Sequence, residues 1–222
     1  MKLQFSTCAM CRPEILEETY RSWTSKMKGI SYKDSTLFID VAPIPPEDIM
    51  KREIVVEVAK AYFGNVITNL PSERNFFRAM KWCWSEASAD YLFHLEDDWR
   101  LEKEFHIDEL FSIMENNPKI MQVSVRHHPS DWRGVTFCPG LLKKIYYKTF
   151  AEKFLDKKDE KVYMSYEANP EAFMRRIQWD VGISYENTVL YPNEIIVSDI
   201  GERWKRQRAF FSKTYLSQYK SE

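Results

Sequence analysis

Residues 91–99 read Tyr-Leu-Phe-His-Leu-Glu-Asp-Asp-Trp, and this stretch decides the fold. Its first five residues are mostly apolar, as in a strand that is buried on both faces of a parallel sheet. Three consecutive carboxylates follow, and they would repel one another unless water or a cation lies between them. The stretch therefore predicts a central strand, over residues 90–96, with an acidic cluster at its carboxyl end.

The three acids have the chemistry of a metal site. Side chains two residues apart on a strand point to the same face, so Glu96 and Asp98 would share one side and Asp97 would point away and brace the turn. Two hard oxygen ligands at the carboxyl end of a central strand suit Mg²⁺ or Mn²⁺ that holds a diphosphate. Asp98 is the predicted direct ligand, and Glu96 is expected to hold the metal, its water or a ribose. The alternative is an acidic turn that only stays hydrated.

Composition limits the class of protein. The chain has 222 residues, 44% hydrophobic, 29% charged and 15% aromatic, which suits a soluble globular protein with a substantial core and a pocket for flat ligands. A net charge of −1 gives no general attraction to nucleic acid, and a total of 6 glycines argues against Gly-rich phosphate loops. The chain has no apolar stretch for a membrane span, no signal-peptide core and no disulfide framework among its 4 cysteines, so we expect a cytoplasmic location.

The order of predicted elements indicates one α/β domain with a mainly parallel central sheet flanked by helices. Strands alternate with helices through the first 125 residues, as in βαβ units, and the C-terminal third is less regular. The predicted strands cover residues 2–7, 36–41, 65–69, 90–96, 120–125 and 189–197. The predicted helices cover residues 13–27, 47–62, 72–87 (capped by Ser72), 107–116, 140–155 and 170–177.

In this order the chain resembles a nucleotide-sugar glycosyltransferase of the glycosyltransferase-A fold. The acidic motif takes the place of the family's DxD motif, and the phrase His-Leu-Glu-Asp-Asp-Trp is similar to one in small viral and phage glycosyltransferases, including chlorovirus enzymes that decorate a capsid protein. The other matching segments lie at a first strand and helix start and where such enzymes place acceptor-side and closing-loop residues. The segments that carry the resemblance are Phe5–Thr7, Arg12–Glu14, Leu95–Trp99, Asn169–Glu171 and Asp199–Trp204.

The resemblance implies a Rossmann-like domain over residues 1–222, in which 1–125 hold a nucleotide sugar and 126–222 form the acceptor side and a closing tail. It implies a glycosyltransferase that moves a hexosyl or deoxyhexosyl group from a nucleoside diphosphate-sugar, with UDP favoured, to a glycan or glycoprotein. Mn²⁺ or Mg²⁺ would lie on the diphosphate, and in a viral protein the location would be the host cytoplasm. Glu96 stands where the family has Asp, and it is a longer ligand.

The nucleotide is expected outside the carboxyl ends of the strands, because open α/β sheets bind ligands there. The loop from Thr7 to Arg12 would hold the base and ribose, and Asp40 and Asn69 end neighbouring strands on the same edge. Arg12 could contact a phosphate or remain a solvated charge at a helix start. Arg74 could reach the diphosphate or sugar, or form an ordinary surface ion pair.

The acceptor side offers several candidates for a general base, which an inverting enzyme needs near the acceptor hydroxyl. Glu171, at a predicted helix start, is preferred over Glu167 and Asp131, and a retaining enzyme needs none of them as a base. Near the C-terminus, Asp199 could complete the metal shell and Arg203 could pair with phosphates. The alternative for this segment is a solvated basic tail.

Other classes of protein remain open. Cys8 and Cys11 form a CxxC between a strand and a helix, as in a thioredoxin-like redox protein, where the helix end lowers a thiol pKa. The same pair with His127 and His128 could bind zinc, although a second CxxC is missing. A non-enzymatic carbohydrate- or protein-binding module and a nucleotidyltransferase that releases pyrophosphate are the further alternatives.

Overall fold

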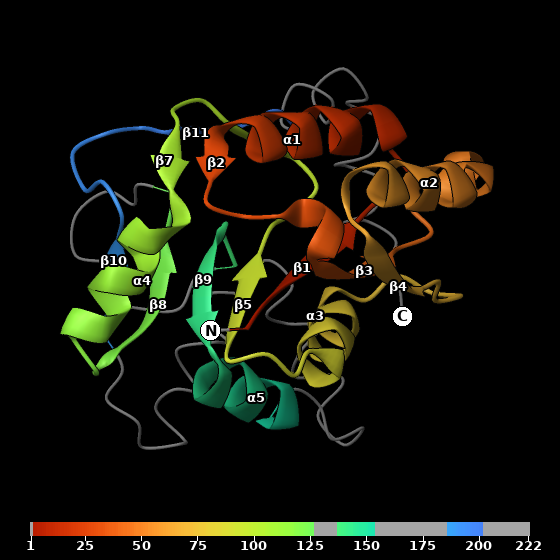
Figure 1. The fold of residues 1–222 in the computed structure, drawn as a ribbon. Helices are drawn as coiled ribbons and strands as arrows, with labels where there is room; N and C mark the ends of the chain where they lie inside the picture. The colour runs from red at the N-terminus through yellow and green to blue at the C-terminus, as the bar shows by residue number, and fades with distance from the viewer. Residues whose placement is uncertain (1, 127–136, 154–185, 202–222) are drawn as a thin grey trace.

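A seven-stranded sheet with helices on both faces forms the centre of the molecule (Figure 1). The computed structural model describes residues 2–126, 137–153 and 186–201. The strand order is β10-β8-β9-β5-β1-β3-β4, and one half of the sheet is parallel. This half consists of β1 (Leu3–Ala9), β3 (Thr36–Val41), β4 (Asn65–Asn69) and β5 (Tyr91–His94).

The other half of the sheet is mixed. The strand next to β5 runs antiparallel to both of its neighbours, while the edge strand is parallel to the strand beside it. These strands are β8 (Ile120–Ser124), β9 (Gly140–Lys143) and β10 (Glu186–Val189). The predicted α/β fold with a mainly parallel sheet is therefore confirmed, with one strand of opposite direction.

Helices cover the two faces of the sheet in separate layers (Figure 1). On one side lie α1 (Pro13–Lys26), α2 (Arg52–Tyr62) and α4 (Ile107–Asn116), and on the other α3 (Phe76–Glu86) and α5 (Lys144–Lys153). Alternate strand residues enter the two cores: Phe5 and Phe93 face α1, whereas Phe38 and Leu92 face α3. Within the described ranges, no helix is long and apolar enough to cross a membrane.

Short elements complete the fold. Two turns of 3-10 helix and two small strand pairs lie outside the main sheet. They are η1 (Tyr32–Asp34), η2 (Pro46–Lys51), the pair of β2 (Met27–Lys28) with β7 (Phe105–His106), and the pair of β6 (Trp99–Leu101) with β11 (Val197–Asp199).

The sheet has a topological switch point between β1 and β5. From β1 the chain builds outward through β3 to β4, and it then returns to place β5 on the other side of β1. At such a point the connections leave in opposite directions and open a crevice at the carboxyl ends of the two strands. Arg12 follows β1 and the acidic motif follows β5, so the fold brings both to this crevice.

Several predicted elements differ from the structure. The predicted helix 47–62 begins as the 3-10 helix η2, and the predicted helix 72–87 begins only at Phe76. The segment 140–155 begins with β9 and becomes helical only at Lys144, because Gly140–Lys143 fits between β5 and β8. The segment 189–197 is not one strand, since it contains the end of β10, a turn and the start of β11. The central strand ends at His94 instead of residue 96. The predicted helix 170–177 lies outside the described residues.

Candidate functional site

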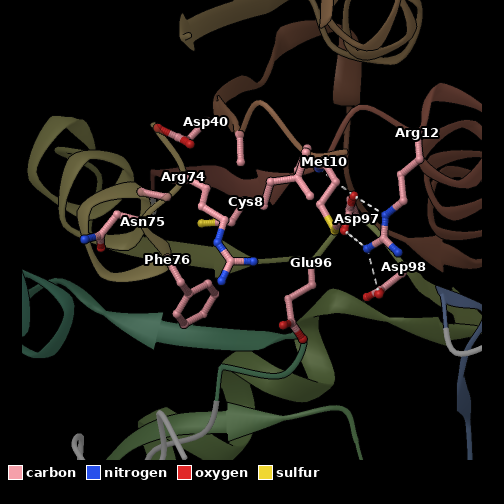
Figure 2. A pocket seen from close by; sticks show the side chains of 14 residues that line it. Cys8, Met10, Arg12, Asp40, Arg74, Asn75, Phe76, Glu96, Asp97 and Asp98 are labelled. Carbon is pink, nitrogen blue, oxygen red and sulfur yellow. Dashed lines mark hydrogen bonds and ion pairs between the residues drawn. The ribbon is translucent and has the colours of Figure 1, made fainter. Parts of the chain in front are cut away.

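A cavity of about 320 Å³ lies in the crevice at the carboxyl ends of β1, β3 and β5 (Figure 2). Its walls come from the loop after β1, the end of β3, the start of α3 and the acidic motif. The residues that line it are Cys8, Ala9, Met10, Arg12, Asp40, Ala42, Ile44, Arg74, Asn75, Phe76, Ala79, Glu96, Asp97 and Asp98. Six of the predicted site residues are thus brought together: Arg12, Asp40, Arg74, Glu96, Asp97 and Asp98.

The acidic motif is a turn. Because β5 ends at His94, the strand alternation expected for the three acids does not apply. Asp97 and Asp98 both turn toward Arg12, whereas Glu96 points away from this pair (Figure 2). The expected grouping of Glu96 with Asp98, and of Asp97 on the other side, is therefore wrong.

Arg12 forms ion pairs with both aspartates of the turn. Its Nε and Nη2 donate to Oδ2 and Oδ1 of Asp97 at 2.9 and 2.6 Å, and Nη2 also donates to Oδ2 of Asp98 at 2.8 Å. The arginine side chain is only 2% exposed. Burial alone lowers the pKa of Arg12, but the two carboxylates raise it above its ordinary value. The interpretation of Arg12 as a solvated charge is wrong.

Helix α1 holds the turn's main chain in place. Thr19 Oγ1 donates to the backbone oxygen of Asp97 at 2.8 Å, and Trp23 Nε1 donates to that of Trp99 at 2.7 Å. The indole of Trp99 in turn donates to Oε2 of Glu96 at 2.7 Å. Buried side-chain donors thus fix the backbone on which the acids stand, as is required of a site with defined geometry.

The segment after β11 packs against Asp98. The backbone N–H of Ile200 donates to the backbone oxygen of Asp98 at 2.9 Å, and a Cβ on Gly201 would lie 2.2 Å from Asp98 Oδ2. Only glycine fits this close approach. Asp199 is exposed and does not line the cavity, so the structure does not join this predicted metal ligand to Glu96 and Asp98. Arg203 lies outside the described residues.

The ends of β3 and β4 form another wall. Asp40 and Asn69 are paired in register, as predicted for neighbouring strands, and Asn69 Nδ2 donates to Asp40 Oδ2 at 2.5 Å. Burial raises the pKa of Asp40 to about 6, against the lowering effects of that hydrogen bond and of Arg52. Asp40 lines the cavity, whereas Asn69 reaches it only through Asp40.

The start of α3 supplies the remaining wall. The helix begins at Phe76, where Asn75 Oδ1 caps it by accepting from the N–H of Arg78 at 3.0 Å, so the predicted cap at Ser72 is wrong. Arg74 therefore stands just before the helix N-terminus, half-buried, with its guanidinium extending toward the Glu96 side of the cavity (Figure 2). Sequence reasoning missed Asn75 and Phe76, although asparagine before an apolar run is a recognised helix-start signal.

Thr7 does not reach the cavity. Strand β1 continues to Ala9, and Thr7 is fully buried within it, where its hydroxyl accepts a hydrogen bond from Tyr20 at 3.0 Å. From this segment the cavity is lined by Cys8 and Ala9 at the end of β1 and by Met10 and Arg12 after it. Other predicted residues lie outside the described ranges: His127, His128, Asp131, Glu167, Glu171 and Arg203.

The two cysteines of the CxxC have separate partners. Cys8 Sγ donates to Met80 Sδ at 3.3 Å, and Cys11 Sγ donates to the backbone oxygen of Ala42 at 3.2 Å. A hydrogen bond with Cys83, followed by burial, raises the pKa of Cys8, and burial raises that of Cys11. A redox dithiol needs a thiolate of lowered pKa, so this environment disfavours the thioredoxin-like alternative.

The carboxylates of the turn could supply some, but not all, of the ligands of a hard divalent cation. Glu96 and Asp98 line the cavity with carboxylate oxygens, the ligands that Mg²⁺ and Mn²⁺ prefer. Over residues 2–126, 137–153 and 186–201, no group of three or more His, Cys, Asp or Glu could hold a metal ion. Mg²⁺ is usually held by one or two carboxylates together with substrate phosphates. The residues therefore fit a metal whose other ligands come from a diphosphate.

Comparison with known proteins shows that the chain resembles solved structures in fold but matches no known family by sequence. No family model matches the chain, and no curated protein matches its sequence. Among solved structures, S. aureus TarS 1-349 aligns with TM-score 0.61 and 9% identity, over 89% of this chain and 60% of that chain. Mouse xyloside xylosyltransferase 1 aligns with TM-score 0.53 and 10% identity, over 84% and 85%. A CMP:2-keto-3-deoxy-manno-octonic acid synthetase complexed with CTP aligns with TM-score 0.53 and 10% identity, over 96% and 100%.

These matches confirm the predicted fold class. The chain has the α/β fold that glycosyltransferase-A enzymes share with nucleotidyltransferases, with a mixed, mostly parallel sheet of seven strands between helices. TarS 1-349 has also been solved in complex with UDP, and that structure aligns with TM-score 0.59 and 9% identity. A shared fold does not by itself assign a function, so the site must decide it.

Proposed function

We propose that this protein is a glycosyltransferase that moves a sugar from a nucleoside diphosphate-sugar, with UDP-sugar favoured, to a glycan or protein-linked acceptor. The observation that carries the proposal is the cavity at the switch point, with Arg74 on one wall and the acidic turn on the other. Doubly wound sheets bind nucleotides at this place. The volume of about 320 Å³ falls in the range of small-molecule sites.

The walls suggest how the donor would lie. The nucleoside would occupy the end near Asp40. The diphosphate would lie beside the guanidinium of Arg74, just outside the N-terminus of α3, where both the cation and the helix dipole favour negative charge. The sugar would then face Glu96 and Asp98.

In the transfer, the bond between the anomeric carbon and a diphosphate oxygen breaks, and its electron pair leaves with that oxygen. The acceptor hydroxyl oxygen bonds to the anomeric carbon and gives its proton to a base, for which Glu171 remains the predicted residue. Arg74 would offset the charge that develops on the leaving diphosphate. A divalent cation held by Asp98 and the diphosphate would supply Lewis-acid neutralisation of the same charge when bound.

The loop after β1 favours glycosyl transfer over nucleotidyl transfer. A nucleotidyltransferase must bind a triphosphate, for which backbone N–H groups of a loop are the usual donors. Here the N–H of Met10 donates to Asp97 Oδ2 at 2.9 Å, that of Cys11 to the Ile44 oxygen at 2.7 Å, and that of Arg12 to the Met10 oxygen at 2.8 Å. The N–H groups of Met10, Cys11 and Arg12 are therefore not available to a triphosphate.

A thermal-shift screen followed by product analysis tests the proposal. UDP-, GDP- and dTDP-sugars are each added with and without Mn²⁺, and a bound donor raises the melting temperature by mass action. We expect one class of donor to do so and the nucleoside diphosphate to appear as product once an acceptor is supplied. No shift with any donor would contradict the proposal, and release of pyrophosphate from a nucleoside triphosphate would establish nucleotidyl transfer instead.

A further inference from the structure

We infer that Arg12 is a resident counter-ion of the acidic turn and makes divalent-metal binding conditional on a nucleoside diphosphate. The inference rests on the proposed function, since it takes the metal and the diphosphate from it. It adds a positioning residue: Arg12, which lines the cavity beside the acidic turn, acts through Asp98 by deciding when that carboxylate can serve a metal.

The ion pairs give Asp98 a cation before any metal arrives. Nη2 of Arg12 lies 2.6 Å from Asp97 Oδ1 and 2.8 Å from Asp98 Oδ2 (Figure 2). The side chains of Arg12, Asp97 and Asp98 are 2%, 4% and 8% exposed, so little water screens their charges. The N–H of Met10 donates to Asp97 Oδ2 at 2.9 Å and fixes that carboxylate against the guanidinium.

A metal ion that bound alone at Asp98 would meet two obstacles. It would stand close to a buried, permanently charged guanidinium and be repelled by it. The carboxylate also cannot turn away from Arg12 toward Gly201, because that glycine already fits closely against the Asp98 side chain. Displacing Arg12 would leave Asp97 buried without its bidentate partner, which is costly.

A nucleoside diphosphate removes the first obstacle, and the second no longer matters because the Asp98 carboxylate need not turn away from Arg12. Its phosphate oxygens supply the missing metal ligands, and their negative charge offsets the repulsion between the metal and Arg12. The carboxylate of Asp98, which lines the cavity, can then join the metal while Arg12 keeps its contacts with Asp97. Metal and diphosphate should therefore bind cooperatively, and each should raise the affinity of the other by the same factor.

A double variant isolates the role of Arg12. Arg12→Met with Asp97→Asn removes one positive and one negative charge, so the net charge of the turn is unchanged while Asp98 loses its resident cation. Arg12→Lys retains a cation at the position and is the matched control. Arg12→Gln with Asp97→Asn preserves hydrogen bonding between the two sites and serves if the methionine pair does not fold.

The experiment titrates Mn²⁺ into each folded variant, with free Mn²⁺ measured by electron paramagnetic resonance, in the absence and presence of UDP. For the wild type and Arg12→Lys, we expect weak binding of Mn²⁺ alone and a gain of at least about 10-fold with UDP, the usual size of coupling between sites. In the double variant, Mn²⁺ alone should bind at least about 10-fold more tightly than in the wild type, and UDP should add less.

Two results would overturn the inference. One is wild-type protein that binds Mn²⁺ alone as tightly as with UDP, and the other is a double variant with no gain in affinity for Mn²⁺ alone. Failure of the proposed function looks different, because UDP would then bind to no variant with or without Mn²⁺. The comparison of Mn²⁺ affinities without UDP would still decide the role of Arg12.

Discussion

The two walls of the cavity hold their charges in different ways. On the turn wall, formed by Glu96–Asp98 and Arg12, the arginine is 2% exposed and donates three hydrogen bonds to two carboxylates. On the helix wall, formed by Arg74–Phe76 and Asp40, Arg74 is half-buried beside a helix start and burial raises the pKa of Asp40 to about 6. We propose from this difference that the ion pairs of the turn wall hold the fold in place, whereas the charges of the helix wall meet the ligand.

The largest expected effect is on the turn wall. Arg12→Met should lower the free energy of unfolding by about 3–5 kcal/mol, because it leaves the carboxylate of Asp97 buried without its partner. Adding Asp97→Asn should recover most of the loss. Urea unfolding measures both, and Arg21→Met on the exposed face of α1 is the control, expected within about 0.5 kcal/mol of wild type. A loss as small as that of the control would show that the ion pairs do not hold the turn.

The helix wall should respond to pH in the opposite sense to a carboxylate whose pKa is lowered by the fold. The pKa of Asp40 is raised from 3.8 to about 6 in the fold, so its protonated form favours folding and that contribution is lost as pH rises through this window. Relative to wild type, Asp40→Asn should gain up to about 3 kcal/mol between pH 4 and pH 7. Urea unfolding at a series of pH values checks this, and a constant difference between the two proteins would contradict it.

Catalysis should depend on the charge of Asp98. Asp98→Asn should lower the rate of sugar transfer by about 100-fold or more, as expected when charge stabilisation of the leaving group is lost. The variant should still fold, since Asp97 keeps its two hydrogen bonds to Arg12. Single-turnover release of nucleoside diphosphate measures the rate, with Asp90→Asn at the opposite end of β5 as the control. Full activity in Asp98→Asn would refute its assignment.

The smallest expected effect is a change in UDP affinity on the helix wall that leaves the stability of the protein nearly unchanged. Arg74→Met should weaken the binding of UDP about 10-fold, as for the loss of one charged hydrogen bond, with little change in stability. Arg78→Met, an exposed position one turn along on α3, should leave the affinity unchanged. Calorimetric titration with UDP compares the two variants. Equal affinity in Arg74→Met and wild type would place the diphosphate elsewhere.

Elements with strong local signals were predictable from the sequence. The strands Thr36–Val41 and Asn65–Asn69 and the helix Ile107–Asn116 have the bounds that their apolar patterns and flanking residues predicted. The pairing of Asp40 with Asn69 followed from the rule that parallel strands end on the same edge.

What was missed depends on contacts far apart in the chain. The acceptors of Arg12 lie 85 and 86 residues away, so no local pattern distinguishes this buried arginine from a solvated one at a helix start. Gly140–Lys143 became a strand because Leu141 and Leu142 enter cores on opposite faces of the sheet, a choice that only β5 and β8 dictate. The three acids lie in a turn instead of continuing the strand, because Thr19 of α1 holds the backbone oxygen of Asp97.

The most direct test of the central claim is a crystal structure with UDP and Mn²⁺. The account predicts a nucleoside diphosphate in the cavity between the two walls, with its phosphates beside Arg74 and Mn²⁺ between those phosphates and Asp98. A cavity that stays empty under saturating UDP and Mn²⁺, or a nucleotide bound at another face of the sheet, would contradict it.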